Sequence, residues 1–398
     1  MKRSSLSDIF RPESSVRYFL LSLLMTGLSY GLYKGILDNY LAEIVLMGEM
    51  DRGITEFFRE IPGVTLVLIL AVLYMLSAQS LYKLGAVIMF GGMLMHAVLP
   101  PDKVLITLAI CVYALGEHIQ QPIKSTLTLH YAQPGKGGAA LGRQSAAGQI
   151  GTLAGYLVIA VVFTGVAGRE RYVLFFLIAA ALALLSGGLS LGIKGSSDTD
   201  ETKRRFYFHK KYTKFYMLEM FYGARKQVFI TFGPYVLILF YGASASTVSF
   251  LFAISAVACF FAAPLVGRLI DRVGYKAVMV ADTLILVIVC FFYGAAHHLF
   301  SREVAFIVCC VNYCLDAVIS LASMATNMYV KDLSDSEAEM KATLSTGVSI
   351  NHLITIFIAL FGGWIWKTLG IETLFTISAV LGLANSAYAA TIKTGKAL

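Results

Sequence analysis

The sequence contains little charge for its length. Asp, Glu, Lys and Arg make up only 14% of its 398 residues, whereas 58% are hydrophobic, and the mean hydropathy is +0.73. A soluble globular domain of average composition has about 25% charged residues. This composition therefore excludes an ordinary water-soluble domain and predicts an integral membrane protein.

Several motifs that carry chemistry are also absent. The sequence has no G-x-x-x-x-G-K-[ST] loop for a nucleotide phosphate, and the run "QPGKGGAALG" lacks both the Ser or Thr and a preceding strand. Direct coupling to ATP hydrolysis is therefore disfavoured. G-x-S-x-G and H-E-x-x-H patterns are missing too, which disfavours an enzyme. We predict a protein that is not an enzyme and that needs no cofactor.

The six cysteines lie inside apolar runs, so no external disulfide framework is expected. Cys310 and Cys314 share a helical face near Asp316, but buried free cysteine usually packs as a small hydrophobic residue. His297 and His298, at the outer end of a predicted helix, are favoured as interfacial residues. We therefore predict no metal site.

Apolar runs long enough to cross about 30 Å of hydrocarbon recur along the whole chain. They predict an all-α membrane protein with twelve transmembrane helices. The predicted helices cover residues 16–45, 53–78, 83–99, 103–130, 139–165, 172–194, 214–240, 245–266, 276–299, 303–330, 341–366 and 371–392. The first apolar run is too long for a signal peptide, so the first helix is expected to be retained.

Lysine and arginine gather in alternate connections between these helices. Because positive residues stay on the cytoplasmic side, both termini are predicted to be cytoplasmic, in a multi-pass protein of the cytoplasmic (inner) membrane. The net charge of +8 then reflects topology and not nucleic-acid binding.

One long polar connection, "KGSSDTDETKRRFYFHKKYTK", divides the chain. It predicts an N-terminal six-helix bundle over residues 1–194, a cytoplasmic linker over 195–213 and a C-terminal six-helix bundle over 214–398. The segments "SLYKLGAVIMFGG" and "DRVGYKAVMVADT" occupy matching places in the two halves as a faint internal repeat. We expect two pseudo-symmetric bundles in a monomer.

The turn between the eighth and ninth helices, "GRLIDRVGYK", resembles the G-x-x-x-D-R-x-G-R-R/K signature of the major facilitator superfamily. The residues that match are Gly267, Asp271, Arg272, Gly274 and Lys276. The copy that the family carries between helices 2 and 3 is reduced here to "LSAQSLYKLG", which retains Lys83 and Gly85. The resemblance implies a 6+6 helical fold over the whole chain.

The chemistry of this turn can be understood without the resemblance. Gly267 and Gly274 allow a tight turn, and Asp271 can cap the positive end of a neighbouring helix. An ordinary basic loop would explain the cations but not an acid between two glycines. Pseudo-symmetry in the family implies that, in the outward-open state, Asp271 lies at the start of the fifth helix near Arg143 and latches the two halves.

Charged residues also recur near the middle of the first, fourth, seventh and tenth helices, which line the central cavity in the superfamily. Each such charge costs about 2.5–3.5 kcal/mol and needs a partner, water or a ligand. The predicted substrate-binding residues are Tyr30, Lys34, Asp38, Glu117, Gln121, Arg225, Lys226, Asn312 and Asp316. The predicted proton-coupling residues are Asp38, Glu117, Glu219 and Asp316, because desolvation favours protonation of a carboxyl group.

Internal pairing is the alternative for these charges: Lys34 with Asp38, and Arg225 with Glu219 or Asp316. Arg59 and Glu60 form an outer gate or snorkel to the interface, and the sequence leaves both readings open. Small residues on the fifth and eleventh helices are expected to allow close packing of helices.

The sequence thus predicts a secondary transporter that works by alternating access, with protons as the coupling ion. Lys34, Arg225 and Lys226 favour a small organic solute with an anionic or zwitterionic group, and the rings of Tyr30, Tyr33, Tyr222 and Phe229 would pack its apolar part. Removing Arg225 should abolish transport and leave the fold intact. The alternatives are a multidrug or lipid exporter of the same fold, a non-transporting membrane sensor and a lipid-modifying enzyme.

Overall fold

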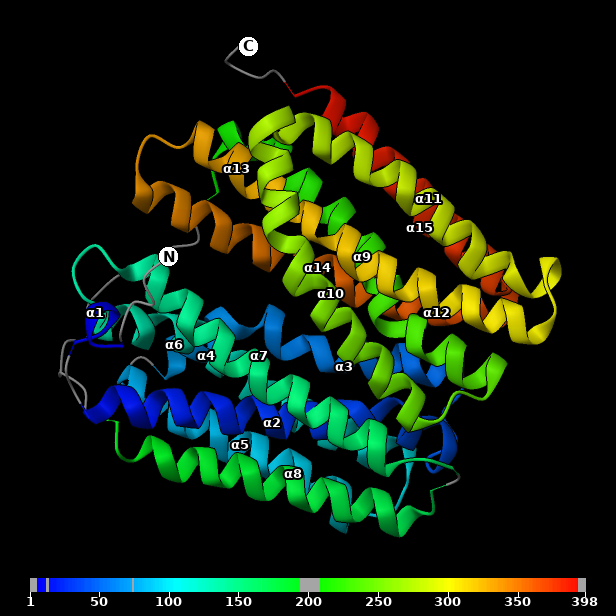
Figure 1. Ribbon diagram of the computed structural model, residues 1–398, viewed down its shortest axis with the longest axis horizontal. Helices are drawn as coiled ribbons and strands as arrows, with labels where there is room; N and C mark the ends of the chain where they lie inside the picture. The colour runs from blue at the N-terminus through cyan, green and yellow to red at the C-terminus, as the bar shows by residue number, and fades with distance from the viewer. Residues whose placement is uncertain (1–5, 12–13, 74, 166, 194–207, 393–398) are drawn as a thin grey trace. The chain divides into compact units, whose positions relative to one another are not determined.

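The computed structural model describes residues 6–11, 14–73, 75–165, 167–193 and 208–392 (Figure 1). They fall into two compact units. Unit 1 consists of Met1–Leu46, Phe58–Glu201 and Ser244–Phe250, and unit 2 of Met47–Phe57, Thr202–Ala243 and Leu251–Leu398. Residues 194–207, which include most of the predicted linker, lie outside the described residues.

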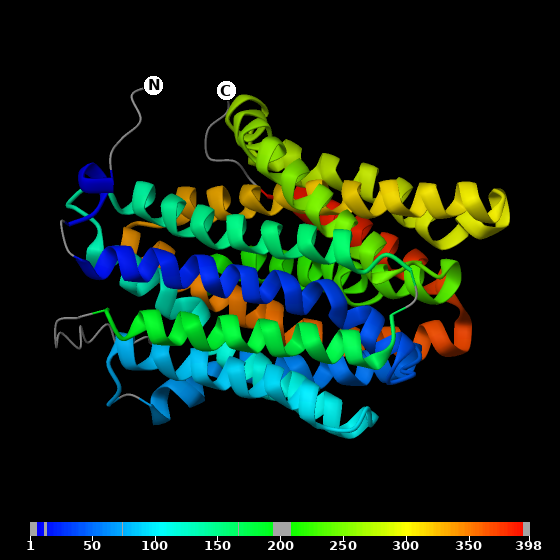
Figure 2. The same cartoon turned by 60° about the horizontal axis from the view of Figure 1, so that its bottom comes forward.

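Unit 1 holds the first set of helices. They are α1 (Leu6–Ile9), α2 (Ser14–Glu43), the end of α3 (Glu49–Val64), α4 (Leu66–Val72), α5 (Ala78–Val98), α6 (Lys103–Tyr131), α7 (Gly137–Val162) and α8 (Arg169–Ser190). Helix α2 packs against α7 and α8, and α5 packs against α6 and α8 (Figure 2).

Unit 2 holds the second set. It contains the start of α3, η1 (Lys210–Tyr212), α9 (Thr213–Tyr241), most of α10 (Ala245–Val273), α11 (Tyr275–Leu299), α12 (Arg302–Ile319), η2 (Ser320–Ser323), α13 (Met324–Leu333), α14 (Glu337–Leu369) and α15 (Ile371–Ala390). Helix α9 packs against α14 and α15, and α11 packs against α12 and α15. This pairing repeats that of unit 1, helix for helix, as the predicted pseudo-symmetry requires.

The observed helices follow the predicted ones, most of them within a few residues, with two breaks. The second predicted helix divides at Thr65 into α3 and α4. There the Thr65 hydroxyl donates to the Ile61 carbonyl at 2.9 Å, a bond that bends helices. The tenth predicted helix is interrupted by η2 and continues as α13.

Ten of the described helices are long and apolar enough to span a membrane. They are Ser14–Glu43, Ala78–Val98, Lys103–Tyr131, Gly137–Val162, Arg169–Ser190, Ala245–Val273, Tyr275–Leu299, Arg302–Leu333, Ala342–Leu369 and Ile371–Ala390. Helix α9 and the α3–α4 pair, which were also predicted as spans, are not among these ten described segments. Both carry several charges, which lower their mean hydropathy.

Glycines allow α2 and α7 to approach closely. A Cβ atom placed on Gly31 would collide with the Thr152 carbonyl oxygen, and one on Gly151 with the Leu24 carbonyl oxygen. These contacts are with backbone atoms, which cannot rotate away. The expectation that small residues on the fifth helix pack against a neighbour is therefore confirmed.

The turn in "GRLIDRVGYK" is made by one glycine and not by two. Gly274 has φ 83° and ψ 152°, a conformation that is essentially restricted to glycine. Gly267 lies inside α10, which continues to Val273. The prediction that Gly267 forms part of the turn is wrong, because the helix extends about two turns beyond the predicted end of the apolar run.

The described end of the predicted linker is fixed to unit 2. The Lys211 Nζ atom lies 2.7 Å from Asp335 Oδ2 and 3.2 Å from Glu339 Oε1. A hydrogen bond from the Asp335 amide, together with bonds from Tyr212 and Lys211, lowers the pKa of Glu339 to about 2. The linker therefore enters α9 through a network of charged hydrogen bonds.

Candidate functional site

The first group of candidate residues lies on α2 in unit 1. Lys34 Nζ is 2.8 Å from Asp38 Oδ2, and the Asp38 side chain is 1% exposed while that of Lys34 is 20% exposed. Tyr30, one turn earlier, is half-buried and hydrogen-bonded to Tyr156 on α7. The internal pairing expected for Lys34 and Asp38 is therefore present, and Lys34 remains partly accessible.

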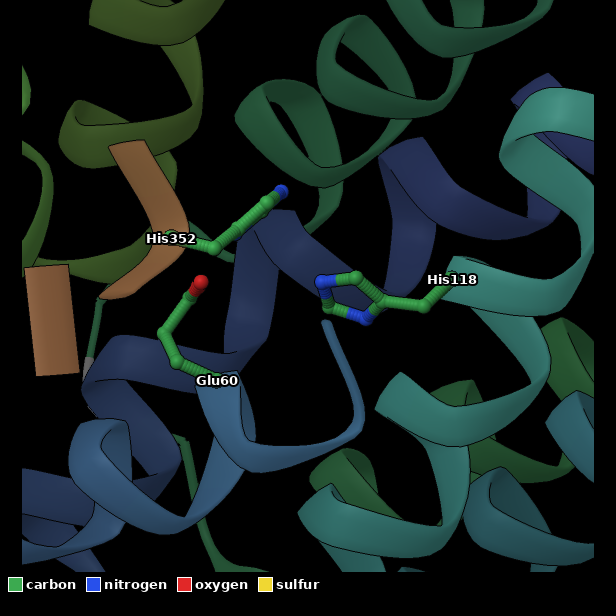
Figure 3. A group of neighbouring side chains, drawn as sticks. All are labelled: Glu60, His118 and His352. Carbon is green, nitrogen blue, oxygen red and sulfur yellow. The ribbon is translucent and has the colours of Figure 1, made fainter. Parts of the chain in front are cut away.

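A second charged group joins α3 to α6 within unit 1. Arg59 forms an ion pair with Glu60, and its Nη1 atom lies 3.9 Å from Glu117 Oε2. The ring of His118 extends from α6 toward Glu60, and their nearest ligand-type atoms are within 4.8 Å (Figure 3). Arg59 is thus paired with an acid on α6. A residue that only snorkels to the interface would not have such a partner.

Gln121, one turn after Glu117, is exposed and lies apart from this group. Its neighbour Gln120 is buried and donates to the Tyr82 carbonyl at 3.0 Å. Of the two amides, Gln120 therefore has a packing role within unit 1, and Gln121 faces outward from it.

Arg225 on α9 has a partner that the sequence did not suggest. Its side chain is almost fully buried, and Nη2 donates to Asp282 Oδ2 on α11 at 2.9 Å. The alternative of internal pairing therefore applies to Arg225, but with Asp282 as its partner in place of Glu219 or Asp316. Asp282 could have been noticed as a lone acid in the run "VMVADTLILVIV", but nothing local connects it to residue 225.

The ring of Tyr222 lies close to both cations of α9. Its centroid is 5.0 Å from the Arg225 guanidinium carbon and 5.7 Å from Lys226 Nζ. The Tyr222 hydroxyl donates to the Ser320 carbonyl at 3.0 Å, where α12 gives way to η2. Lys226 is half-buried, so it is the more accessible of the two cations.

Asp316 on α12 is buried, with 8% of the residue exposed. Its carboxyl group forms no hydrogen bond or ion pair with any residue that the structure describes, although Arg225 and Lys226 are near enough to act on it electrostatically. Asn312, one turn earlier, donates to the Val308 carbonyl at 2.7 Å. Asp316 therefore differs from the other predicted acids.

Glu219, by contrast, is already hydrogen-bonded. Its carboxylate accepts from Thr326 Oγ1 at 3.3 Å and from Asn351 Nδ2 at 3.4 Å. These bonds connect α9 to α13 and α14 inside unit 2, so Glu219 has a structural role in addition to any role with protons.

Two of the predicted aromatic residues belong to the core of their units. Tyr33 packs against Tyr113 with ring centroids 4.4 Å apart, and Phe229 packs against Phe375 at 5.0 Å. Both side chains are buried. Both rings are thus packed within their own units, and their contact with a substrate stays a prediction.

The residues of the predicted gate are divided between the units. Asp271 and Arg272 are exposed in the last turn of α10, and Lys276 is half-buried in the first turn of α11. Arg143 is exposed on α7 and belongs to unit 1. The contact of Asp271 with the start of α7 remains a prediction.

Comparison with known proteins agrees with this architecture. Residues 215–394 match the sequence profile of the Major Facilitator Superfamily. None of the curated proteins matches the sequence.

Among solved structures, a mutant of the nucleoside transporter NupG is 17% identical, with a TM-score of 0.75 over 95% of this chain and 100% of that one. A D-xylose-proton symporter is 15% identical, with a TM-score of 0.74 over 95% and 97% of the two chains. The xylose transporter XylE from E. coli is 14% identical, with a TM-score of 0.72 over 94% and 95%. At these identities the likeness concerns the fold: the whole chain has the fold of these transporters, and its residues 215–394, somewhat less than half of it, also match the sequence profile of the Major Facilitator Superfamily.

Proposed function

We propose that this protein is a proton-coupled secondary transporter for a small organic solute with an anionic or zwitterionic group. In this proposal it works as a monomer in the cytoplasmic membrane with both termini in the cytoplasm. The observation that carries the proposal is the buried carboxyl group of Asp316, which has no hydrogen-bond or ion-pair partner in the described part of the chain and lies near the partly accessible cation Lys226. The D-xylose-proton symporter of the same fold supports proton coupling as a mechanism.

Each unit by itself offers charges that a substrate could meet. Lys34 and Arg59 in unit 1 and Lys226 in unit 2 are partly accessible cations, and each has a carboxyl group close by. An anionic group can approach such cations, and an ammonium group can approach the acids. Half-buried Tyr30 and Tyr222 offer aromatic surface for the rest of the solute. This arrangement favours carboxylates, phosphates and amino acids over uncharged sugars.

Asp316 is the best of the four predicted proton carriers. Asp38 is in an ion pair with Lys34, Glu117 lies near Arg59, and Glu219 accepts two hydrogen bonds. Each of those acids would have to break an existing interaction when it takes up a proton. Asp316 has no such interaction among the described residues, so protonation costs it no bond and removes a negative charge from the neighbourhood of Lys226.

Arg225 contributes to the site indirectly in this proposal. Its charge is balanced by Asp282, and its guanidinium group lies against the Tyr222 ring. It therefore holds the tyrosine and shapes the field around Asp316, whereas Lys226 is the residue that an anion would reach.

A substrate panel followed by one substitution tests the proposal. Purified protein is screened by thermal shift against carboxylates, phosphates, amino acids and sugars at pH 6 and pH 7.5, because a ligand stabilises the state that it binds. The compounds that stabilise it are then used with Asp316→Asn in proteoliposomes. We expect accumulation driven by a pH gradient to be lost and substrate exchange at equal pH to persist.

Glu303→Gln is the matched control, since Glu303 is an exposed acid at the start of the same helix. It should accumulate substrate as the wild type does. Wild-type accumulation by Asp316→Asn would contradict the role of Asp316, and stabilisation by uncharged sugars alone would contradict the substrate class.

A further inference from the structure

Two adjacent histidines and a glutamate meet where α11 ends and α15 begins, both within unit 2. His297 and His298 are in the last turn of α11, and Glu372 is in the first turn of α15. The His297 Nε2 atom lies 3.0 Å from Glu372 Oε1, and the His298 Nε2 atom lies 2.8 Å from that same oxygen. Two imidazole rings therefore converge on one carboxylate oxygen.

Adjacent residues on a helix point about 100° apart, so their side chains do not normally share a partner. Here the two ring centroids are only 3.9 Å apart. The three side chains are 22%, 63% and 41% exposed in the order His297, His298, Glu372. The group is therefore both convergent and open to the aqueous phase.

The turn between α14 and α15 holds the glutamate in this place. Gly370 has φ 91° and ψ 165°, and a Cβ atom there would lie 2.7 Å from Glu372 Oε2. A side chain at position 370 would thus be strained and would also displace the carboxylate. On the other side, the ring of Phe240 lies 5.3 Å from the His297 ring. Glu372 and His297 are therefore positioned before any ligand arrives.

The donor set is two imidazole nitrogens and one carboxylate oxygen, which suits zinc and other borderline divalent metals. The candidate ligand atoms all lie within 4.8 Å of one another. Ligands about 2.0–2.1 Å from a tetrahedral zinc ion are about 3.3–3.4 Å apart. The atoms must therefore move by less than about 1 Å to admit an ion, and the exposed side of the group leaves a position for water.

We propose that His297, His298 and Glu372 form a binding site for a divalent transition-metal ion of the zinc type. The ion would replace the hydrogen bond between His298 and Glu372 and the close contact between His297 and Glu372. Each neutral ring would present the Nε2 lone pair and carry its proton on Nδ1. It would join the end of α11 to the start of α15, on the membrane face opposite the Gly274 turn. The site is separate from the charged residues of the transport proposal and does not depend on them.

The alternative for this group is a purely electrostatic one. A glutamate in the first turn of a helix and histidines in a last turn are both favoured by the helix dipole. Such an arrangement would need no ion. Direct measurement of metal binding separates the two.

The experiment titrates ZnCl₂ into full-length protein that was purified with a histidine-free affinity tag and treated with a chelator. Calorimetry should give one zinc ion per chain with a Kd in the micromolar range or below, and zinc should raise Tm. The double variant His297→Ala/His298→Ala should weaken binding at least 10-fold and lose the rise in Tm. Glu372→Gln should weaken binding while keeping the helices in place.

His130→Ala/His209→Ala is the matched control, because it removes two partly exposed histidines elsewhere and should bind zinc as the wild type does. X-ray absorption of the zinc-loaded wild type should show nitrogen and oxygen ligands at about 2.0–2.2 Å. The proposal is overturned if the wild type shows no saturable binding, or if Glu372→Gln and the double histidine variant both bind zinc as tightly as the control. None of these readouts involves transport.

Discussion

Arg225 is a buried charge on α9, and its partner lies on another helix. Its guanidinium group is buried against Asp282, which is 57 residues later in the chain. Taking two charges out of water is expensive, and their attraction repays this cost only when the pair is intact. The pair therefore makes both residues necessary for unit 2, whatever their part in transport.

Removing one partner of this pair should destabilise the protein strongly. We expect Arg225→Ala or Asp282→Ala to lower the free energy of unfolding by about 3–5 kcal/mol, because each leaves a buried charge alone. The double variant Arg225→Met/Asp282→Leu should lose less than either single variant. Thermal and denaturant unfolding in detergent would measure these differences.

Lys226→Ala is the control, because that neighbouring cation is half-buried and has no ion-pair partner as close as Asp282 is to Arg225. Equal stability of Arg225→Ala and Lys226→Ala would show that the pair is not structural. The sequence alone predicts that Arg225 can be removed without harm to the fold; its burial against Asp282 predicts the opposite, and the sequence could not show that burial.

These residues also show which side-chain pairings can be predicted from the sequence and which cannot. Lys34 and Asp38 are one helical turn apart, so their pairing follows from local geometry and was predicted. The pairing of Arg225 with Asp282 depends on how α9 meets α11, and no local pattern encodes it. The inward orientation of Tyr33 and Phe229 was missed for a similar reason, because helices that face lipid on one side and protein on the other are apolar all round.

At the scale of elements, the helices themselves were predictable because membrane-spanning length and apolar composition are properties of a continuous segment. The points at which a helix is interrupted could not be predicted. The division at Thr65 and the 3₁₀ turn η2 arise from local hydrogen bonds within otherwise apolar runs. The packing of α2 on α7 lies between these cases. Its glycines are visible in the sequence, but which of them face the partner helix is not.

Two glycines on α7 allow a test of which glycines are needed for the close packing of α2 on α7. Gly151→Ala places a methyl group against the Leu24 carbonyl, whereas a Cβ atom at Gly148 has nothing within 4 Å. Overpacking of this kind typically costs about 1–3 kcal/mol. We expect Gly151→Ala to lower Tm and the yield of folded protein.

Gly148→Ala, three residues away on the same helix, is the control and should behave as the wild type. If both variants unfold at the wild-type temperature, the close approach of α2 and α7 does not contribute to stability.

At the scale of the whole molecule, the two units repeat one scheme of helix pairing with different charged residues. In unit 1 an ion pair joins α3 to α6, and in unit 2 an ion pair joins α9 to α11. Alternating access in this superfamily requires two such bodies to move with respect to each other. The turn at Gly274 carries the one acid that was predicted to regulate this motion.

Asp271→Asn tests that prediction. The carboxylate should favour the outward-open state by capping the start of α7, an interaction that contributes about 0.3–1 kcal/mol when exposed and up to about 2 kcal/mol when partly buried. We expect the substitution to shift the population several-fold toward the inward-open state with no change in Tm. Spin labels across the cytoplasmic face would report the distances.

Arg268→Gln, which removes a nearby exposed charge on α10 and keeps Asp271, is the matched control. A distance distribution in Asp271→Asn that is identical to that of the wild type would leave the acid without a conformational role.

The buried pair between α9 and α11 also has a consequence for the order in which the protein is made. Ribosomes add about 5–20 residues per second, so Asp282 follows Arg225 by about 3–11 s. During that interval the charge of Arg225 has no carboxylate from α11 to neutralise it. Helix α9 itself is too polar to rank among the apolar spans. An earlier segment of the chain offers α9 two other partners: Glu56 of α3 accepts a hydrogen bond from Gln227 at 3.0 Å, and the carbonyl of Met47, just before α3, accepts one from Tyr235 at 3.1 Å. The hydrogen bonds that α9 makes to this earlier segment can therefore form as soon as α9 is synthesised, whereas its ion pair must wait until Asp282 has been translated.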